Sequence, residues 1–166
     1  MKIGLISDTH SYLDASVFTY FKDCDEIWHA GDFGNVSIFD KLAAFKPTIG
    51  VYGNIDGQDV RIVLQEDLFF EREGLIIYMT HIGGSPGKYP ARVKQQILLH
   101  KPAIFVCGHS HILRVVSDPG YNNMLYLNPG AAGKEGFHKM RTLMRFEINA
   151  GKVEKMQVIE LGLRGK

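Results

Sequence analysis

The chain contains several short apolar runs that stop abruptly at residues able to bind a metal ion. The first run, Ile3–Ile6, is too short for a helix and leads into Ser7-Asp8-Thr9-His10, a pattern typical of a buried strand followed by a loop. Side chains at positions i and i+2 of an extended segment point the same way. Asp8 and His10 can therefore present a carboxylate and an imidazole to one point.

The same pattern, an apolar run that ends in a polar loop, recurs along the chain. Later runs are followed by Gly31-Asp32, Gly53-Asn54, Thr80-His81 and Gly108-His109-Ser110-His111. Four of the seven histidines lie in such loops, which a random scatter would not favour. Because ligands bind at the carboxyl ends of strands in α/β sheets, we expect these loops to converge.

Helical spacing between the apolar runs predicts an α/β fold. One helix is expected after the first loop and another over Ser37–Phe45, where Ser37 and Asp40 have capping-box spacing. Three strand–loop–helix units indicate a largely parallel sheet in the first half. The second half is richer in strands and includes a predicted hairpin over Leu68–Glu71 and Leu75–Met79. We expect one domain, 1–166, because no shift in composition divides the chain.

Charge and cysteine content exclude several classes of protein. The formal net charge of +1 gives no field that would draw nucleic acid or a membrane surface. No segment approaches the roughly 20 apolar residues that span a bilayer. Cys24 and Cys107 are too few and too isolated for a disulfide scaffold. We therefore expect a reduced, cytoplasmic protein.

The residues that follow the apolar runs form one candidate metal site, and all of them offer nitrogen or oxygen ligands. They are Asp8, His10, Asp32, Asn54, His81, His109 and His111. The alternative is that aspartate and asparagine serve loop geometry alone, and for Asn54 taken singly that alternative is preferred. It explains His109 and His111 poorly, because two adjacent imidazoles repel each other once they are protonated. A metal centre accounts for the whole set.

The ordered motifs Asp8-x-His10, Gly31-Asp32, Gly53-Asn54, His81 and Gly108-His109-x-His111 resemble those of the calcineurin-like metallophosphoesterases. The compact chain is most similar to the small phosphodiesterases of the YfcE type, a group that includes the retromer-subunit relatives. The resemblance covers Ile3 to about Gly130. It implies an α/β (α+β) sandwich of two mixed β-sheets packed face to face with flanking helices. It also implies a metal site at the carboxyl-terminal ends of the strands.

By this resemblance, the centre binds two metal ions and works through them. The first ion is held by Asp8, His10 and His111, and the second by Asn54, His81 and His109, with Asp32 as a bridge between them. Two cations about 3.5–4 Å apart lower the pKa of a shared water until hydroxide attacks phosphorus in line. Mixed nitrogen and oxygen ligands suit transition metals better than Mg or Ca. Manganese is our first choice, with Ni, Co, Fe or Zn as alternatives.

The chain departs from the family pattern immediately after Asn54. Many relatives have a histidine there that protonates the leaving group, whereas this chain has Ile55, followed by Asp56. General acid catalysis is typically worth about 100- to 10,000-fold. The small YfcE-type members also lack this histidine and are associated with phosphodiester rather than efficient monoester hydrolysis. We therefore expect a metal-dependent phosphoric diester hydrolase, with a small phosphodiester as substrate and Asp32, Asn54 and His81 acting through the metals.

Basic residues near the site are candidates for substrate contact. Lys88 and Arg92 follow the glycine-rich loop after His81 and could clamp a phosphate; the alternative is a flexible turn with solvated basic residues. His138 could reach the substrate or be a solvated loop residue. We expect His29 to support the strand that carries Asp32 rather than to bind metal.

Two other functions stay open for the same chain. The site could serve a phosphomonoesterase or a nuclease, although a dedicated nuclease grips phosphates through clusters of lysine and arginine that this chain lacks. The chain could instead be a catalytically weak interaction scaffold of the retromer-subunit type. Ile55 favours the scaffold, and the complete set of ligands disfavours it. Edge strands of a two-sheet sandwich leave a homo-oligomer open.

Overall fold

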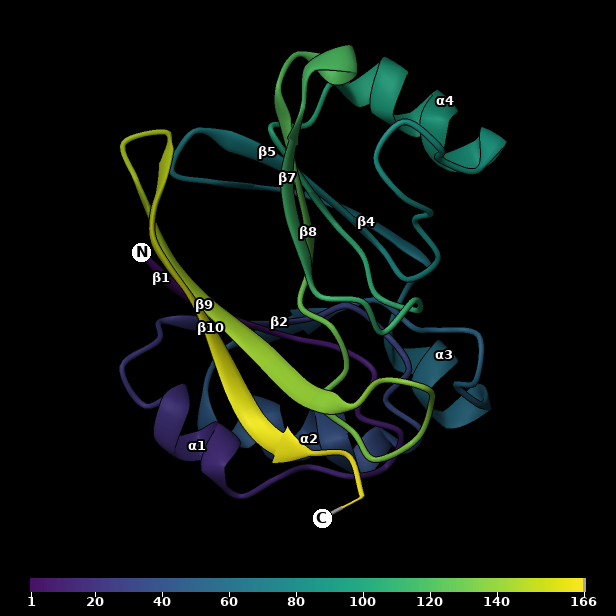
Figure 1. Cartoon of the computed structure of the whole chain (residues 1–166), viewed down its shortest axis with the longest axis vertical. Coiled ribbons are helices and arrows are strands. Elements are labelled where there is room, and N and C mark those ends of the chain that lie inside the picture. The colour runs from purple at the N-terminus through teal and green to yellow at the C-terminus, as the bar shows by residue number, and fades with distance from the viewer. Residues whose placement is uncertain (166) are drawn as a thin grey trace.

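The first of two five-stranded sheets contains the first and the last strand of the chain (Figure 1). The computed structural model describes residues 1–165. In this sheet the strand order is β10-β9-β1-β2-β3, with bounds β1 Lys2–Ile6, β2 Glu26–His29, β3 Thr48–Gly50, β9 Met140–Asn149 and β10 Lys152–Leu163. β1, β2 and β3 are parallel, whereas β9 runs antiparallel to both β1 and β10.

The second sheet is built from the middle of the chain. Its order is β4-β5-β6-β8-β7, with bounds β4 Asp67–Arg72, β5 Leu75–Thr80, β6 Ile104–Val106, β7 Arg114–Asp118 and β8 Met124–Asn128. β5, β6 and β8 are parallel, and the edge strands β4 and β7 pair antiparallel. The predicted hairpin over β4 and β5 is therefore confirmed. Both sheets are mixed, as the resemblance implies.

Alternation along the strands packs the two sheets face to face. In β1, Ile3 and Leu5 belong to the central core with Trp28 of β2 and with Ile77 and Val106 of the other sheet. Successive residues of a strand point to opposite faces, so Gly4 and Ile6 face away from the second sheet. The predicted sandwich is confirmed.

Helices cover the two outer faces. α1 (Ser16–Tyr20), α2 (Val36–Phe45) and α3 (Gln58–Val63) contribute to the apolar cluster on the outside of the first sheet, and α4 (Ala91–His100) packs on the second. Figure 1 shows α1 and α2 on the side opposite to α4. A short 3₁₀ helix, Pro119–Tyr121, precedes β8. Within residues 1–165, no helix is long and apolar enough to cross a membrane.

One predicted helix start was wrong, and one helix was not predicted. α2 begins at Val36, one residue before the predicted start, because Asn35 is the cap and its side chain accepts a hydrogen bond from the Ser37 N–H at 2.8 Å. α3 was not predicted at all. Its only buried residue is Val60, whereas Ile62 and Val63 are exposed, so no apolar stripe at helical spacing marks it.

The carboxyl ends of the parallel strands of both sheets meet at one edge of the sandwich. After β1, the Asp8 N–H donates to the Gly31 carbonyl at 3.0 Å, which joins the loops of β1 and β2. After β6, the Gly108 N–H donates to the His81 carbonyl at 3.0 Å, which joins the loops of β5 and β6. The His109 N–H donates to Oδ2 of Asp8 at 3.1 Å and joins the loops of the two sheets. The loops that carry the candidate ligands therefore converge, as expected.

Candidate metal centre

The loops turn sharply as soon as the strands end. Five of the seven predicted ligands have a left-handed backbone: Asp8 (φ 53°), His10 (46°), Asp32 (58°), His109 (66°) and His111 (57°). Residues other than glycine rarely adopt this conformation, although aspartate and histidine do so more often than most. Such strain costs of order 1–3 kcal/mol per residue and clusters at functional sites. Its concentration on these residues marks the edge as the site.

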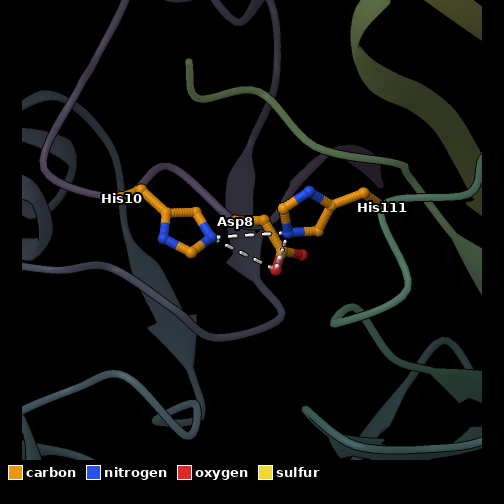
Figure 2. A group of neighbouring side chains, drawn as sticks. All are labelled: Asp8, His10 and His111. Carbon is orange, nitrogen blue, oxygen red and sulfur yellow. Dashed lines mark hydrogen bonds and ion pairs between the residues drawn. The ribbon is translucent and has the colours of Figure 1, made fainter. Parts of the chain in front are cut away.

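Asp8 uses one carboxylate oxygen for the protein and directs the other into the site (Figure 2). Its Oδ2 accepts hydrogen bonds from the Ser7 hydroxyl at 2.6 Å and from the His109 N–H at 3.1 Å. Its Oδ1 is buried and has no hydrogen-bond partner among the described residues. This Oδ1 lies 3.0 Å from Nε2 of His111 and 3.8 Å from Nε2 of His10.

Asp32 divides its two oxygens in the same way. Its Oδ1 accepts a hydrogen bond from the Ile55 N–H at 3.1 Å. Its Oδ2 lies 3.1 Å from Nε2 of His81 and 3.7 Å from Nε2 of His10. One oxygen of Asp32 therefore faces both groups of ligands, which is the position that a bridging carboxylate requires.

The hydrogen bond of His81 identifies the nitrogen that faces Asp32 as a lone-pair donor. Nδ1 of His81 lies 2.7 Å from the Ala30 carbonyl, and a carbonyl can only accept, so Nδ1 carries the proton. Nε2 then has a lone pair directed at Oδ2 of Asp32, and it is buried without a hydrogen-bond partner in residues 1–165. When the ring is neutral, these two electron-rich atoms 3.1 Å apart repel each other. Burial would lower the pKa of His81, but Asp32 and Asp8 raise it, so without metal a proton on Nε2 relieves the repulsion. A metal ion at the same place would replace that proton.

A second histidine pair gives the same result at Asp8. Nε2 of His138 lies 3.0 Å from the Gly133 carbonyl and therefore donates, which leaves Nδ1 of His138 as an acceptor. That Nδ1 lies 3.1 Å from Nδ1 of His111, so His111 donates there. Nε2 of His111 consequently presents its lone pair to Oδ1 of Asp8. The two carboxylate–imidazole contacts, Asp32 with His81 and Asp8 with His111, both fit a metal centre.

The structure brings six of the seven predicted ligands together in two groups. The ligand atoms of Asp8, His10 and His111 lie within 4.8 Å of one another, and so do those of Asp32, His81 and His109. Asn54 is exposed and lines a hollow next to His81. The donors match the chemistry of transition-metal ions. Binding of the ions by these residues stays a prediction.

Electrostatics favour positive charge between the two carboxylates. Burial alone would raise the pKa of Asp8, but the neighbouring imidazoles of His10 and His111 and the hydroxyl of Ser7 outweigh burial and hold that pKa below its usual range. Burial would likewise raise the pKa of Asp32, but the neighbouring His81 outweighs burial and holds that pKa below its usual range. In return, the hydrogen bond to Asp8 raises the pKa of His10. A divalent cation would supply the charge that these carboxylates stabilise.

His29 supports the loops that carry Asp8 and Asp32, as expected. Its Nδ1 accepts a hydrogen bond from the Gly31 N–H at 3.1 Å, so its Nε2 donates to the Thr9 hydroxyl at 3.0 Å. The ring stacks on Phe33 with centroids 3.6 Å apart. Burial lowers the pKa of His29 to about 3. A neutral imidazole therefore joins the loops of Asp8 and Asp32.

Asp56 has a role that does not depend on a neighbouring histidine. Its side chain is buried, and its oxygens accept hydrogen bonds from the Gly34 N–H at 2.7 Å and the Gly53 N–H at 2.8 Å. Asp56 thus joins the loop of Asn54 to the loop of Asp32. The sequence marks Asp56 only by its place after Ile55.

Asn128 holds the loop of His109 and His111. Its amide group donates to the Gly108 carbonyl at 2.9 Å and to the Ser110 hydroxyl at 3.1 Å. Its Oδ1 accepts a hydrogen bond from the Gly130 N–H at 3.0 Å. Sequence analysis gave Asn128 no supporting role and considered His138 only as a possible substrate contact. An asparagine in a turn and a histidine in a loop carry no local signal of such contacts.

The structure gives each of the two proposed phosphate-binding residues other contacts, and Arg92 also donates to the Thr80 hydroxyl at 3.4 Å, next to His81. Lys88 is exposed in a tight turn in which its N–H donates to the Ser85 carbonyl at 2.8 Å. The Arg92 guanidinium pairs with Asp67 and, at 3.2 Å, with Glu66. Two carboxylates already balance the charge of Arg92. Contact of either residue with substrate stays a prediction.

A two-sheet sandwich with carboxylates, imidazoles and an amide at the strand ends defines a metallophosphoesterase-like protein. The model of the calcineurin-like phosphoesterase superfamily domain matches residues 1–151. The chain belongs to this superfamily. The match extends beyond the segment from Ile3 to Gly130 that the motifs cover, and membership implies divalent metal ions.

Relatives with names and solved structures agree with this assignment. A probable metallophosphoesterase of Methanothermobacter thermautotrophicus is 30% identical over 138 residues, which cover 79% of this chain and 77% of the relative. A phosphodiesterase of Methanocaldococcus jannaschii is 25% identical over 146 residues, which cover 78% of this chain and 83% of the relative. The zinc complex of Vps29 from Entamoeba histolytica shares the fold, with a TM-score of 0.70, 19% identity and coverage of 96% of this chain and 99% of that one.

Proposed function

We propose that this protein is a dinuclear-metal phosphodiesterase that hydrolyses small phosphodiesters. The observation that carries the proposal is the position of Asp32 Oδ2, which faces Nε2 of His81 at 3.1 Å and Nε2 of His10 at 3.7 Å. A carboxylate oxygen between two sets of ligands is what a two-metal hydrolase needs. The hydrolase relatives support the chemistry of this proposal.

The chain's own residues prepare the site in two ways. Asp8 and Asp32 each keep one oxygen in protein hydrogen bonds, which fixes the direction of the other oxygen. His81 and His111 each donate the Nδ1 hydrogen to a protein group, so Nε2 of each ring faces the site and is the nitrogen available to a metal ion. Two bound divalent ions would supply a water that ionises near neutral pH and positive charge for the phosphate oxygens. We propose Mn²⁺ first, with Ni, Co, Fe and Zn as alternatives.

The residue after Asn54 favours diesters over monoesters. The Ile55 side chain is apolar and 45% exposed, and it cannot protonate a departing oxygen. An alkoxide leaving group therefore departs unassisted, and the enzyme is expected to favour esters with good leaving groups. The relative from Methanocaldococcus jannaschii is named a phosphodiesterase, which supports the same choice.

The alternative is a catalytically weak scaffold, and the likeness to Vps29 is the observation that favours it. Against it, every predicted ligand position holds a residue able to bind metal, and two buried atoms of the site, Oδ1 of Asp8 and Nε2 of His81, have no hydrogen-bond partner in residues 1–165 and suit a cation. Metal binding alone does not separate the two functions, because a scaffold can keep its ions. Turnover separates them.

The test is hydrolysis of bis(p-nitrophenyl) phosphate and p-nitrophenyl phosphate by metal-free protein and by protein with added Mn, Ni, Co, Zn or Mg. We expect metal-dependent turnover that prefers the diester and that Asn54→Ala and His81→Ala both abolish. Lys152→Met, at the opposite end of the first sheet, is the control that keeps activity. Absence of turnover with any metal, despite bound ions, would favour the scaffold. Preference for the monoester would favour a phosphomonoesterase.

We also propose a cytoplasmic location. Both cysteines, Cys24 and Cys107, are buried free thiols, which suits a reducing compartment.

A further inference from the structure

A hollow of about 200 Å³ adjoins the second group of candidate ligands. Its lining includes Tyr52, Asn54, Arg61, Glu66, His81 and Ile82. The hollow lies between the loop that begins α3 and the end of β5. It therefore opens beside two of the residues that we propose as ligands of one metal ion.

Arg61 lies in the lining of this hollow and is held there by neutral groups. Its Nε donates to the Asp56 carbonyl at 2.7 Å, and one terminal nitrogen donates to the Gly53 carbonyl at 3.3 Å. The guanidinium also lies over the ring of Tyr52, with its carbon 4.4 Å from the ring centroid. These contacts fix the direction of the group and leave its charge uncompensated.

The remaining donors of Arg61 are available to a ligand. The second terminal nitrogen makes no hydrogen bond, and the guanidinium forms no ion pair, within residues 1–165. Arg92 differs, because Glu66 and Asp67 balance its charge. A preorganised guanidinium with free donors suits a phosphate oxygen, since charge-assisted hydrogen bonds are the strong ones.

We propose that Arg61 binds a phosphate oxygen of the substrate and that the hollow beside it receives one uncharged ester group of the phosphodiester. This inference rests on the proposed function and names the substrate class of the same site. A volume of about 200 Å³ is below the range of roughly 300–1,000 Å³ that holds a drug-sized ligand. The hollow therefore suits a single ring or a short polyol. Ile82 gives it an apolar wall, and the Glu66 carboxylate disfavours an anionic ester group.

The first experiment measures binding of inorganic phosphate to Mn²⁺-saturated protein by calorimetry, for Arg61→Met, Arg61→Lys and the wild type. We expect Arg61→Met to weaken phosphate binding by about 10- to 100-fold, the worth of one hydrogen bond to a charged group. Arg61→Lys should recover part of the loss. Lys152→Met removes one positive charge at the far end of the first sheet and should change nothing.

A parallel titration with Mn²⁺ separates substrate binding from support of the loop. Arg61 also hydrogen-bonds the Asn54 carbonyl at 3.5 Å, so a purely structural role would weaken Mn²⁺ binding when Arg61 is replaced. Unchanged Mn²⁺ affinity with weaker phosphate binding supports the proposal. Weaker Mn²⁺ affinity with unchanged phosphate binding at saturating Mn²⁺ overturns it.

The second experiment tests the hollow with bis(p-nitrophenyl) phosphate at saturating Mn²⁺. Ile82 is 41% exposed, so Ile82→Trp fills the hollow from its rim without disturbing the core. We expect its KM to rise at least several-fold, while phosphate binding stays within two-fold of the wild type. Ile62→Trp, on the exposed face of α3, is the matched control. An unchanged KM in Ile82→Trp overturns the assignment of the hollow. If the wild type hydrolyses no ester, the proposed function fails, and the phosphate titration still decides the role of Arg61.

Discussion

The backbone N–H of Ile55 donates a hydrogen bond to Oδ1 of Asp32 at 3.1 Å, while the Ile55 side chain is 45% exposed. The residue that follows Asn54 therefore orients the proposed bridging carboxylate through its backbone alone. Its side chain is free to change without loss of that contact. The position where many relatives have a histidine can consequently be altered independently of the metal ligands.

Replacing Ile55 with histidine should add general acid catalysis to this site. We expect Ile55→His to increase hydrolysis of alkyl phosphate esters by about 10-fold or more, since a positioned acid typically contributes about 100- to 10,000-fold. Nitrophenyl esters, whose leaving groups need no proton, should gain little. The measurement is kcat/KM for both kinds of ester in the presence of Mn²⁺.

Ile55→Gln is the control for this substitution, because it adds a polar group that cannot transfer a proton. Thermal stability of both variants should stay close to that of the wild type, as is usual for exposed positions. An equal gain in Ile55→His and Ile55→Gln would show that polarity, and not proton transfer, limits the natural enzyme.

His138 should govern the affinity of the metal position that contains His111. The 3.1 Å contact between the two Nδ1 atoms keeps the lone pair of His111 Nε2 directed into the site. We expect His138→Ala to weaken binding of that Mn²⁺ ion by about 10- to 100-fold, the usual effect of losing such a supporting contact. Calorimetric titration of metal-free protein with Mn²⁺ measures it.

Asparagine offers a matched rescue, because its Oδ1 can accept the His111 N–H as Nδ1 of His138 does. His138→Asn should therefore bind Mn²⁺ more tightly than His138→Ala. Equal affinity in the two variants would mean that His138 acts by filling space rather than by fixing the proton of His111.

Local patterns in the sequence predicted the strands, most helices and the candidate ligands, whereas the two-sheet sandwich was implied by the resemblance to the calcineurin-like metallophosphoesterases. Apolar runs such as Ile3–Ile6 identify strands, and residues such as Asp8 and His81 follow those strands directly. These patterns could not predict α3, because its apolar residues Ile62 and Val63 are exposed and form no buried stripe. The start of α2 was misplaced because Asn35 and Ser37 are both good caps, and only the hydrogen bond distinguishes them.

The supporting contacts of the site could not be read from the sequence, because they join residues far apart in the chain. His138 lies 27 residues from His111, and the roles of both rings depend on which nitrogen faces a carbonyl. Arg61 is six residues past Ile55 on a helix without a sequence signal, so nothing placed it beside Asn54. Tertiary geometry decides these contacts, whereas local pattern decides the ligands.

His29 should make the fold sensitive to acid. Its pKa is lowered to about 3 by burial, whereas an exposed histidine titrates near 6.5. Between these two values the unfolded chain binds a proton that the folded chain does not, so stability falls as the pH falls through this window and is fully present above about 6.5. From pH 6.5 to 4.5 this residue alone should remove about 2–3 kcal/mol.

Urea denaturation of metal-free protein at a series of pH values measures this effect against His29→Asn. Asparagine does not titrate, and its side-chain oxygen can accept the Gly31 N–H in place of Nδ1. The variant should be less stable than the wild type at pH 7 but should lose less stability on acidification. Parallel curves for the two proteins would contradict the prediction, because other groups titrate equally in both.

The left-handed backbone of the ligands should make the metal-free fold more stable when glycine replaces a ligand than when alanine does. His109 is the suitable position, since it has φ 66°, its side chain is exposed, and its N–H still reaches Asp8 in either variant. The left-handed region costs alanine about 1–2 kcal/mol, and the unfolded-state entropy of glycine offsets part of the difference. We expect His109→Gly to unfold at a temperature about 2–4 °C above His109→Ala in the presence of a chelator. Both variants should lose the same metal affinity, because both lack the imidazole. A higher unfolding temperature for the alanine variant would show that the loop relaxes out of the left-handed conformation when no metal is bound.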